Sequence, residues 1–383
     1  MKRNIVTGID IGTNTTRIII AEISKNSGAP RIIGMGNVES RGMRNGYVIN
    51  VNEITKSVRM ALDIAEKEAG ISVQNIFLSI GGIGLESIST QGSIMVSRAD
   101  NEVTDLDIEK VISVAKEKLK LINKRIIETV PISYKLDNKE IYGNPIGLKG
   151  NKLEAKIFFT LCFEPHLDDI MRATEDAGVE VEDVISAPIA ASLVALTKRQ
   201  RIAGCLLANI GAETVSIAVF ENDIPISLEV FLVGSTDITN DIALGFQIPL
   251  EEAESMKINK TQTFEVKKLN EIIEARLADI FELIELHLKK INRNGLLPAG
   301  IIITGGGAGI ATIEDFAKSA LVLPSKIAHL SVNNRENCFQ DSMWFVAYGL
   351  CIFGFNQTKD SLAWQGVKKY LHGFFSWFRQ FLP

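Results

Sequence analysis

The chain opens with a pattern of apolar and polar positions that predicts strands followed by a helix. Residues 5–22 contain two apolar, β-branched stretches on either side of a polar turn with a glycine, and this pattern predicts a β-hairpin. Residues 32–37 predict a third strand. Residues 52–70 carry apolar side chains at intervals of three and four, the spacing of one helix face. A strand at 76–81, which ends in two glycines, completes a first α/β unit.

From about residue 83 the pattern of apolar and polar positions changes and predicts a small α+β insertion. Strands are expected at 87–96, 125–135 and 153–163, with a helix from residue 105 to about 121 between the first two. Thr104 and the early carboxylates of this helix suit its N-terminus, because the first amides of a helix lack partners within it.

About 200 residues after the first hairpin, the opening pattern recurs. Two predicted helices, at 166–178 and 187–197, lead to strands at 204–208 and 215–220 that again flank a polar turn. Two copies of strand, polar turn and strand indicate that the chain consists of two related halves.

The rest of the chain continues with helices and one further glycine-rich turn. We expect a strand at 224–232, helices at 237–244, 270–292, 313–319 and 341–353, and a strand at 300–304. This last strand runs directly into Gly305, Gly306 and Gly307. Consecutive glycines let a backbone approach a flat ligand closely.

Length and composition fit a protein of two globular domains. The chain has 383 residues, of which 46% are hydrophobic and 23% charged, enough for two buried cores. Its net charge of -5 argues against nucleic acid as a partner. The 4 cysteines have no CxxC spacing and fit a reducing cytoplasm. Asp10 interrupts the N-terminal apolar stretch, so no signal peptide is expected, and no apolar run approaches the ~20 residues of a spanning helix.

The first polar turn has the residues that phosphate binding requires. Backbone amides of Gly12, Thr13, Asn14 and Thr15 can surround phosphate oxygens, and Asp10 can hold Mg²⁺ through water. On this turn alone, a purely structural hairpin is an equally good interpretation. The related second turn and the triple glycine favour a nucleotide site.

Several longer motifs point to a family. The first phosphate motif is GIDIGT, followed by RGMRNGYVINVNEITKSVRMAL. The insertion contains SIGGIGLESISTQGSIMVS, NEVTDLDIEKVISVAK, VPISYKLDN and NPIGLKGNKLEAKI. The most specific segment is GSTDITNDIALGFQIPLEEAESMKI. These segments resemble the actin, Hsp70 and sugar-kinase superfamily and, within it, the FtsA family of bacterial cell-division proteins, over nearly the whole chain.

This resemblance implies an α/β, actin-like (ribonuclease H-like) two-domain ATPase fold with an FtsA-type 1C insertion and a C-terminal amphipathic helix. The expected division is subdomain 1A at 1–82, 164–200 and 336–355, subdomain 1C at 83–163, subdomain 2A at 201–232 and 299–335, subdomain 2B at 233–298, a linker at 356–366 and a membrane-targeting helix at 367–383.

The resemblance also implies that the cofactors are ATP and Mg²⁺. The second phosphate turn would consist of Gly211, Ala212, Glu213 and Thr214. Glu254 and Lys257 would meet the ribose, and Gly305, Gly306 and Gly307 would meet the adenine and its ribose.

The second phosphate turn departs from the usual family pattern, which is close to DIGGGTTD. This chain has Asn209 where a carboxylate near the magnesium ion is expected. Ala212 restricts the backbone of the turn, and Glu213 brings negative charge towards the phosphates. Relatives that hydrolyse well often carry a Glu that orients water. The corresponding position in this chain falls near Ala187. We therefore expect nucleotide binding with slow or absent hydrolysis, and Asp10 as the residue that holds Mg²⁺ through water.

The last residues of the chain predict an amphipathic helix. Its apolar stripe recurs at three- and four-residue intervals and consists of Val367, Tyr370, Leu371, Phe374, Phe375, Phe378, Phe381 and Leu382. The other face carries Lys368, Lys369, Ser376, Arg379 and Gln380, and Trp377 adds to the aromatic content. Packing in a protein core is the alternative interpretation. The terminal position and the aromatic side chains favour a membrane surface, and an extended linker of residues 356–366 would span at most ~36 Å.

The resemblance also suggests partners and a location. FtsA-like proteins bind the C-terminal tail of FtsZ through subdomain 2B, and the basic residues Arg276, Lys289 and Lys290 are candidates for that contact, with a solvated helix face as the alternative. Inner-leaflet lipids, further copies of the chain in filaments through 1C and the actin-like lobes, and later division proteins complete the expected partners. The implied function is a peripheral tether that anchors the FtsZ ring to the cytoplasmic face of the bacterial cell membrane at the division site.

Two other functions fit parts of the sequence. A PilM-like type IV pilus assembly protein would share the actin-like fold and a 1C-like insertion, but the terminal amphipathic helix argues against it. A small-molecule kinase of the same superfamily would need a catalytic carboxylate in the cleft and has no use for that helix.

Overall fold

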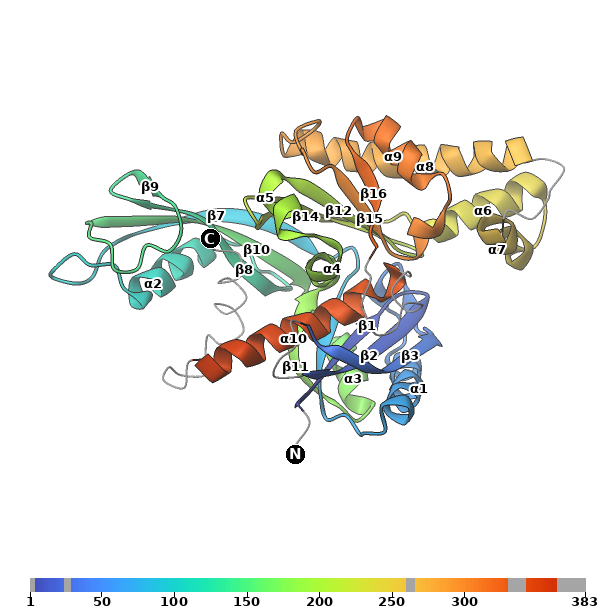
Figure 1. The fold of residues 1–383 in the computed structure, drawn as a ribbon, viewed down its shortest axis with the longest axis horizontal. Helices are drawn as coiled ribbons and strands as arrows, with labels where there is room; N and C mark the ends of the chain where they lie inside the picture. The colour runs from blue at the N-terminus through green and yellow to red at the C-terminus, as the bar shows by residue number, and fades with distance from the viewer. Residues whose placement is uncertain (1–3, 24–28, 260–265, 330–341, 364–383) are drawn as a thin grey trace.

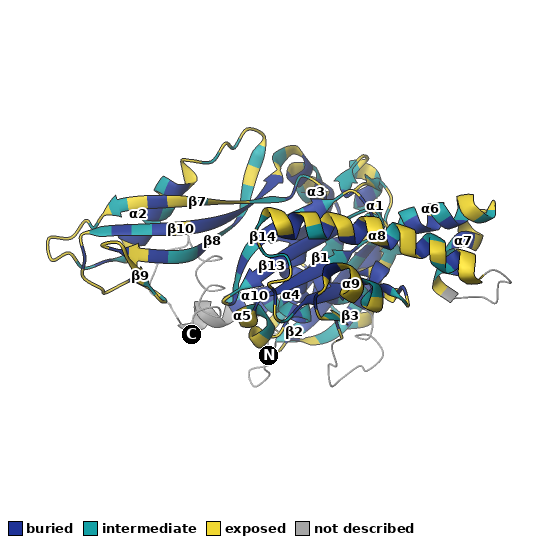
Figure 2. Ribbon diagram, turned by 90° about the horizontal axis from the view of Figure 1, so that it is seen from above, coloured by how far each residue is buried: buried dark blue, intermediate teal, exposed yellow. Residues whose placement is uncertain are grey.

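The computed structural model describes residues 4–23, 29–259, 266–329 and 342–363. Two five-stranded sheets and their helices form the body of the molecule, and a four-stranded sheet with one helix projects from it (Figure 1). Figure 2 shows that buried positions concentrate on the strands of the two body sheets, whereas α8 exposes one side.

The first sheet is built around the predicted N-terminal hairpin. Its strands, in spatial order, are β11 (Glu180–Ser186), β6 (Asn75–Ile80), β1 (Asn4–Ile11), β2 (Thr15–Ile23) and β3 (Arg31–Glu39). β1 and β2 pair antiparallel with Asp10 opposite Arg17, and β6 runs parallel to β1. Helices α1 (Val51–Ala69) and α3 (Glu164–Asp176) cover one face of this sheet. The other face packs against α4 (Ala187–Ala195) and α10 (Phe345–Ala363).

The second sheet repeats this arrangement, as the recurring sequence pattern predicts. Its strands, in spatial order, are β14 (Ile224–Phe231), β13 (Val215–Glu221), β12 (Cys205–Ile210), β15 (Ile301–Thr304) and β16 (Ser325–Ile327). β12 and β13 form the antiparallel hairpin, and β15 runs parallel to β12. The helices of this half are α5 (Lys198–Ala203), α6 (Ser235–Phe246), α7 (Leu250–Asn259), α8 (Val266–Lys290) and α9 (Ile313–Leu321).

The insertion has its own sheet and its own hydrophobic core. Its elements are β7 (Glu86–Met95), α2 (Asp105–Lys116), β8 (Lys124–Leu136), β9 (Lys139–Ile141) and β10 (Lys152–Phe163). Ile108 and Val111 on α2 pack with Phe159 on β10, and these side chains are almost fully buried. The expected Thr104 cap is present as a capping box, since the Asp107 carboxylate accepts hydrogen bonds from the amide and hydroxyl of Thr104 at 2.9 and 2.7 Å.

Helices α4 and α10 cross in close backbone contact. A Cβ added at Gly349 on α10 would lie 1.9 Å from the carbonyl oxygen of Ala190 on α4. A Cβ added at Gly8 on β1 would lie 2.3 Å from the carbonyl oxygen of Ala347 on α10. Glycine at these two positions therefore lets α10 pack directly against both the sheet and α4.

Two helix ends differ by several residues from the sequence-based expectations. Helix α2 ends at Lys116 and not near residue 121, because the chain must turn before β8 begins at Lys124. Helix α10 continues to Ala363, so much of the expected linker at 356–366 is helical. Asn356 is buried, and the side-chain amide of Gln357 donates to the carboxylate of Asp183 on β11 at 3.0 Å, which ties this end of α10 to the body.

Several elements of the body were not expected, among them β11 and α7. Strand β11 carries three acidic residues, Glu180, Glu182 and Asp183, and pairs with β6 at the edge of the first sheet. Helix α7 has a weak apolar face and packs mainly on α6. No helix within the described ranges combines the length and the apolar character needed to cross a bilayer.

Candidate functional site

The two polar turns adopt the same local structure. The amide of Gly12 donates to the carbonyl of Thr15 at 3.0 Å, and the amide of Gly211 donates to the carbonyl of Thr214 at 2.8 Å. At both glycines an added Cβ would lie 3.0 Å from the same carbonyl oxygen. The tight turn after β1 is therefore repeated after β12, once in each half of the molecule.

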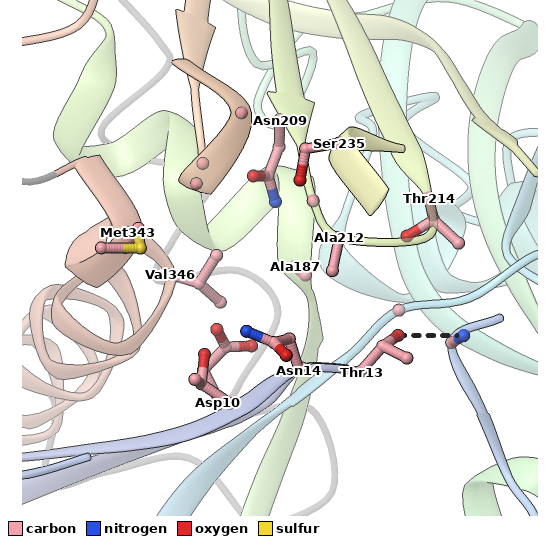
Figure 3. Close-up of a pocket in the computed structure, with 18 of the residues that line it drawn as sticks. Asp10, Thr13, Asn14, Ala187, Asn209, Ala212, Thr214, Ser235, Met343 and Val346 are labelled. Carbon is pink, nitrogen blue, oxygen red and sulfur yellow. Dashed lines mark hydrogen bonds between the residues drawn. The ribbon is translucent and has the colours of Figure 1, made fainter. Parts of the chain in front are cut away.

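A cavity of about 450 Å³ lies between these turns (Figure 3). This volume is within the range of small-molecule and cofactor sites. The nucleotide-site candidates that line it are Asp10, Gly12, Thr13, Asn14, Thr15, Gly211, Ala212, Thr214, Glu254, Lys257, Gly305, Gly306 and Gly307. Of the residues predicted for this site, Glu213 is the one that does not line the cavity.

Asp10 and Asn209 occupy equivalent places on the two hairpins. In Figure 3 they approach the cavity from opposite sides, each two positions before the glycine of its turn. The Asp10 carboxylate accepts a hydrogen bond from the Ser79 hydroxyl at 2.7 Å. Burial raises the pKa of Asp10, while this hydrogen bond and the charge of Arg17 act in the opposite direction. A cation beside Asp10 would favour its ionised form.

The triple glycine forms the wall of the cavity beside α10. Gly305 has a φ of 89° and lies against Asn209, whose Oδ1 would be 2.4 Å from a Cβ at this position. The Ser342 hydroxyl donates to the carbonyl of Gly305 at 3.0 Å, and the Thr304 hydroxyl donates to the carbonyl of Ser342 at 3.1 Å. Gly306 and Gly307 continue into the short 3₁₀ helix η1 (Gly306–Gly309).

Glu254 and Lys257, one turn apart on α7, form a polar network at another side of the cavity. The Lys257 ammonium lies 2.7 Å from the Glu254 carboxylate and donates to the carbonyl of Ser235 at 3.0 Å and to the hydroxyl of Thr239 at 2.8 Å. The Lys257 side chain is only 7% exposed. Both α7 residues predicted to meet a ribose are therefore held in place by α6.

The Glu213 side chain is not part of the cavity lining and reaches towards the other half of the molecule. Its carboxylate accepts a hydrogen bond from the backbone amide of Asn45. Thr13, on the first turn, accepts from the amide of Gly46 at 3.1 Å. The short hairpin of β4 (Met43–Arg44) and β5 (Tyr47–Val48) thus contacts both turns.

Other cavity residues have no recognisable signal in the sequence. Ser79 on β6 and Met343 in η2 (Ser342–Trp344) come from segments far apart in the chain. The roles of Ser79 and Met343 depend on tertiary structure, which local sequence patterns do not encode. Ala187, which the family resemblance places near the position of a water-orienting Glu, also lines the cavity at the start of α4.

His166 lines the cavity as a buried, neutral side chain. Its Nδ1 accepts from the amide of Val48 at 3.4 Å, and its ring meets the edge of Tyr47 at a centroid distance of 5.0 Å. Burial lowers the pKa of His166 to about 4.

The lowered pKa of His166 predicts a specific pH dependence of stability. The unfolded chain takes up this proton near pH 6.5, before the folded chain does, so the contribution is present above about pH 6.5 and is lost as the pH falls towards 4. It amounts to about 3 kcal/mol. Thermal melts at intervals between pH 7.5 and 4 should show a smaller loss of stability for His166→Gln, which can still accept from Val48. Equal slopes for both proteins would contradict the prediction.

The candidate residues for the FtsZ tail do not form one patch. The Arg276 guanidinium is held by both carboxylate oxygens of Asp241, at 2.7 and 3.0 Å. Lys289 pairs with Glu285 at 2.9 Å, and Lys290 lies 3.8 Å from Glu229. Arg276 and Lys289 are separated by about 20 Å along α8, given the helical rise per residue.

The predicted membrane helix lies outside the described residues. This applies to each of its candidates, from Val367 and the basic pair Lys368 and Lys369 to Phe381 and Leu382.

The fold and the cavity between its two related halves define an actin-like protein. A solved structure described as "PilM-PilN type IV pilus biogenesis complex" superposes with a TM-score of 0.69 at 17% identity, covering 91% of this chain and 98% of the other. MreB5 of Spiroplasma citri bound to ADP superposes with a TM-score of 0.52 at 14% identity, over 95% and 99% of the two chains. At these identities the likeness shows the shared fold.

Family comparisons identify the branch of this class. The model for "Cell division protein FtsA" matches residues 206–349, and the model for the "SHS2 domain inserted in FTSA" matches residues 82–160, together more than half of the chain. The FtsA of Pseudomonas aeruginosa is 26% identical over 94% of this chain and 91% of its own length. The FtsA of Escherichia coli is 29% identical over 92% and 90%, and that of Bacillus subtilis 29% over 82% and 76%. The chain belongs to the FtsA family of cell division proteins.

Proposed function

We propose that this protein is a nucleotide-bound membrane tether, which anchors FtsZ filaments to the cytoplasmic face of the cell membrane during division. The observation that carries the nucleotide part is the cavity between two matching glycine turns, whose backbones come from the two halves of the molecule. Membership of the FtsA family supports the role in division.

The proposed ligand is ATP with Mg²⁺. The first turn and the second turn would hold the phosphates through backbone amides, Lys257 and Glu254 would contact the ribose, and the triple glycine would accommodate the adenine. Mg²⁺ would offset phosphate charge when bound, with Asp10 holding it through water. A related fold has been solved with ADP and with AMPPNP, in MreB5 of Spiroplasma citri.

The proposed site favours binding over hydrolysis. Asn209 is neutral and its amide oxygen faces Gly305, so it offers no carboxylate to a metal. Ala187 offers no group that could orient water. We therefore infer that hydrolysis is slow or absent and that the nucleotide has a structural role.

Gly306→Val should test the nucleotide site directly. A Cβ at Gly306 meets only Met343, at 3.5 Å, which is ordinary contact, so the larger side chain would occupy cavity space without straining the fold. We expect binding of Mg-ATP, measured by titration calorimetry, to weaken by at least about tenfold.

The matched control is Ala320→Val, on the exposed part of α9 in the same half. It should bind Mg-ATP like the unaltered protein, and both variants should melt within a few degrees of it. Unchanged affinity in Gly306→Val would remove the cavity from consideration as the nucleotide site.

The tether part of the proposal concerns partners at both ends of the molecule. The C-terminal helix would bind inner-leaflet lipids, the α6 to α8 region would bind the FtsZ tail, and copies of the chain would associate through the insertion and the body. Later division proteins would join this assembly. The predicted subdomain boundaries and the roles of Arg276, Lys289 and Lys290 are part of this proposal.

Binding of an FtsZ tail peptide can be measured by fluorescence anisotropy. Lys289 and Lys290 are exposed, at 52% and 74%, whereas Arg276 is engaged with Asp241. Replacing both lysines with Gln separates a basic docking surface from a merely solvated helix end. Loss of peptide binding would support docking at this end, and no peptide binding by the unaltered protein would contradict the FtsZ role.

A further inference from the structure

The turn between β4 and β5 joins the two halves of the molecule at the cavity. Asn45 and Gly46 have φ values of 53° and 75°, the left-handed conformations of a two-residue Asn-Gly hairpin. Gly46 also packs on the backbone of Gly82, since a Cβ on Gly46 would lie 2.6 Å from the Cα of Gly82. The position of this turn is therefore fixed by the first half.

Two consecutive amides of this turn bind one residue from each phosphate turn. The Gly46 amide donates to the Thr13 hydroxyl at 3.1 Å, as the dashed line in Figure 3 shows, and the Asn45 amide donates to the Glu213 carboxylate. The two phosphate turns thus converge on neighbouring amides. The Glu213 carboxylate is therefore held beside Gly46, which lines the cavity, although Glu213 itself does not.

Within the described ranges no ion pair joins a basic side chain to the Glu213 carboxylate, which accepts its hydrogen bond from the Asn45 amide. The basic side chains among the described lining residues, apart from neutral His166, are Arg17 and Lys257. Lys257 is paired with Glu254, and the Arg17 guanidinium donates to the sulfur of Met343 at 3.2 Å. Negative charge at the phosphate end would therefore meet the charge of Glu213 with little compensation from side chains.

We propose that Glu213 is a specificity-determining residue of the nucleotide site, and that its carboxylate lowers the affinity for a nucleoside triphosphate relative to the diphosphate. This inference rests on the proposed nucleotide function. The terminal phosphate of a triphosphate adds negative charge between the turns, and like charges repel when they lie within about a Debye length of each other. A diphosphate lacks that group, so its affinity is not lowered in this way.

The test compares Mg-ATP and Mg-ADP affinities of the full chain by titration calorimetry. Glu213→Gln removes the charge and keeps an oxygen that can accept from Asn45. We expect its affinity for Mg-ATP to rise about three- to tenfold, with a change of less than about twofold for Mg-ADP. The control is Glu282→Gln, the same charge change on the exposed side of α8, which should alter neither affinity.

The outcomes separate this inference from the function on which it rests. An unchanged ratio of ATP to ADP affinity in Glu213→Gln, with binding intact, would overturn the role of Glu213 and leave the nucleotide site standing. If the unaltered protein binds neither nucleotide at millimolar concentration, the nucleotide function itself fails and this inference with it. Raising the salt concentration should reduce the effect of Glu213→Gln, because the proposed interaction is between charges.

Discussion

Deleting residues 367–383 is expected to release the protein from lipid vesicles. The apolar stripe from Val367 to Leu382 can insert at the level of the lipid headgroups, where aromatic rings are favoured. Each nearby Lys or Arg adds about 1 kcal/mol of attraction to an anionic surface. Loss of all these groups should lower the bound fraction in co-sedimentation with anionic vesicles by at least about tenfold.

The core-packing interpretation of this segment predicts a different result. If the helix packs in the protein, the deletion should lower the melting temperature and leave sedimentation with vesicles unchanged. A second variant, with Lys368, Lys369 and Arg379 replaced by Gln, keeps the apolar stripe. It should bind anionic vesicles more weakly than the unaltered protein and neutral vesicles about equally.

Gly349→Val is expected to destabilise the body of the protein by at least about 3 kcal/mol. Its Cβ would lie 1.9 Å from the carbonyl oxygen of Ala190, and backbone at this distance can yield only if α4 and α10 move apart. Helix propensity acts in the opposite direction, because valine is slightly better than glycine inside a helix. The steric cost is the larger effect.

Urea unfolding followed by circular dichroism would measure this change. Gly309→Val is the matched control, because nothing lies within 4 Å of an added Cβ there. If Gly349→Val is insoluble, Gly349→Ala should show a loss in the same direction. Stability equal to that of the control would mean that the two helices separate without cost.

The sequence predicted the parts of the fold that depend on local periodicity. In α1, Ile54, Val58 and Ala61 are spaced as a helix face, and all three are fully buried. The paired hairpins were visible because each combines β-branched strands with a glycine turn. Strand β11 was missed because its acidic residues resemble those of a solvated loop, while its pairing with β6 is a tertiary contact.

The candidate site was predicted only as far as its backbone motifs extend. The two turns and the triple glycine carry glycine at fixed spacing, so they could be identified without a structure. The direction in which Glu213 points could not, because it depends on the amide of Asn45, which is 168 positions away in the chain. Ser342 likewise meets Gly305 only after α10 has packed on the first sheet and on α4.

Helix α10 has a mechanical consequence for a tethered molecule. It starts beside the cavity, which Val346 and Met343 line, and runs about 28 Å before it reaches Ala363. A force applied through the C-terminal end of α10 would act along the helix axis. Because this force would shear the packing of α10 against α4 and β1, many contacts would share it. The cavity lies at one end of this helix, and the predicted lipid attachment follows the other. Tension at the membrane would therefore be transmitted through α10 to the wall of the cavity.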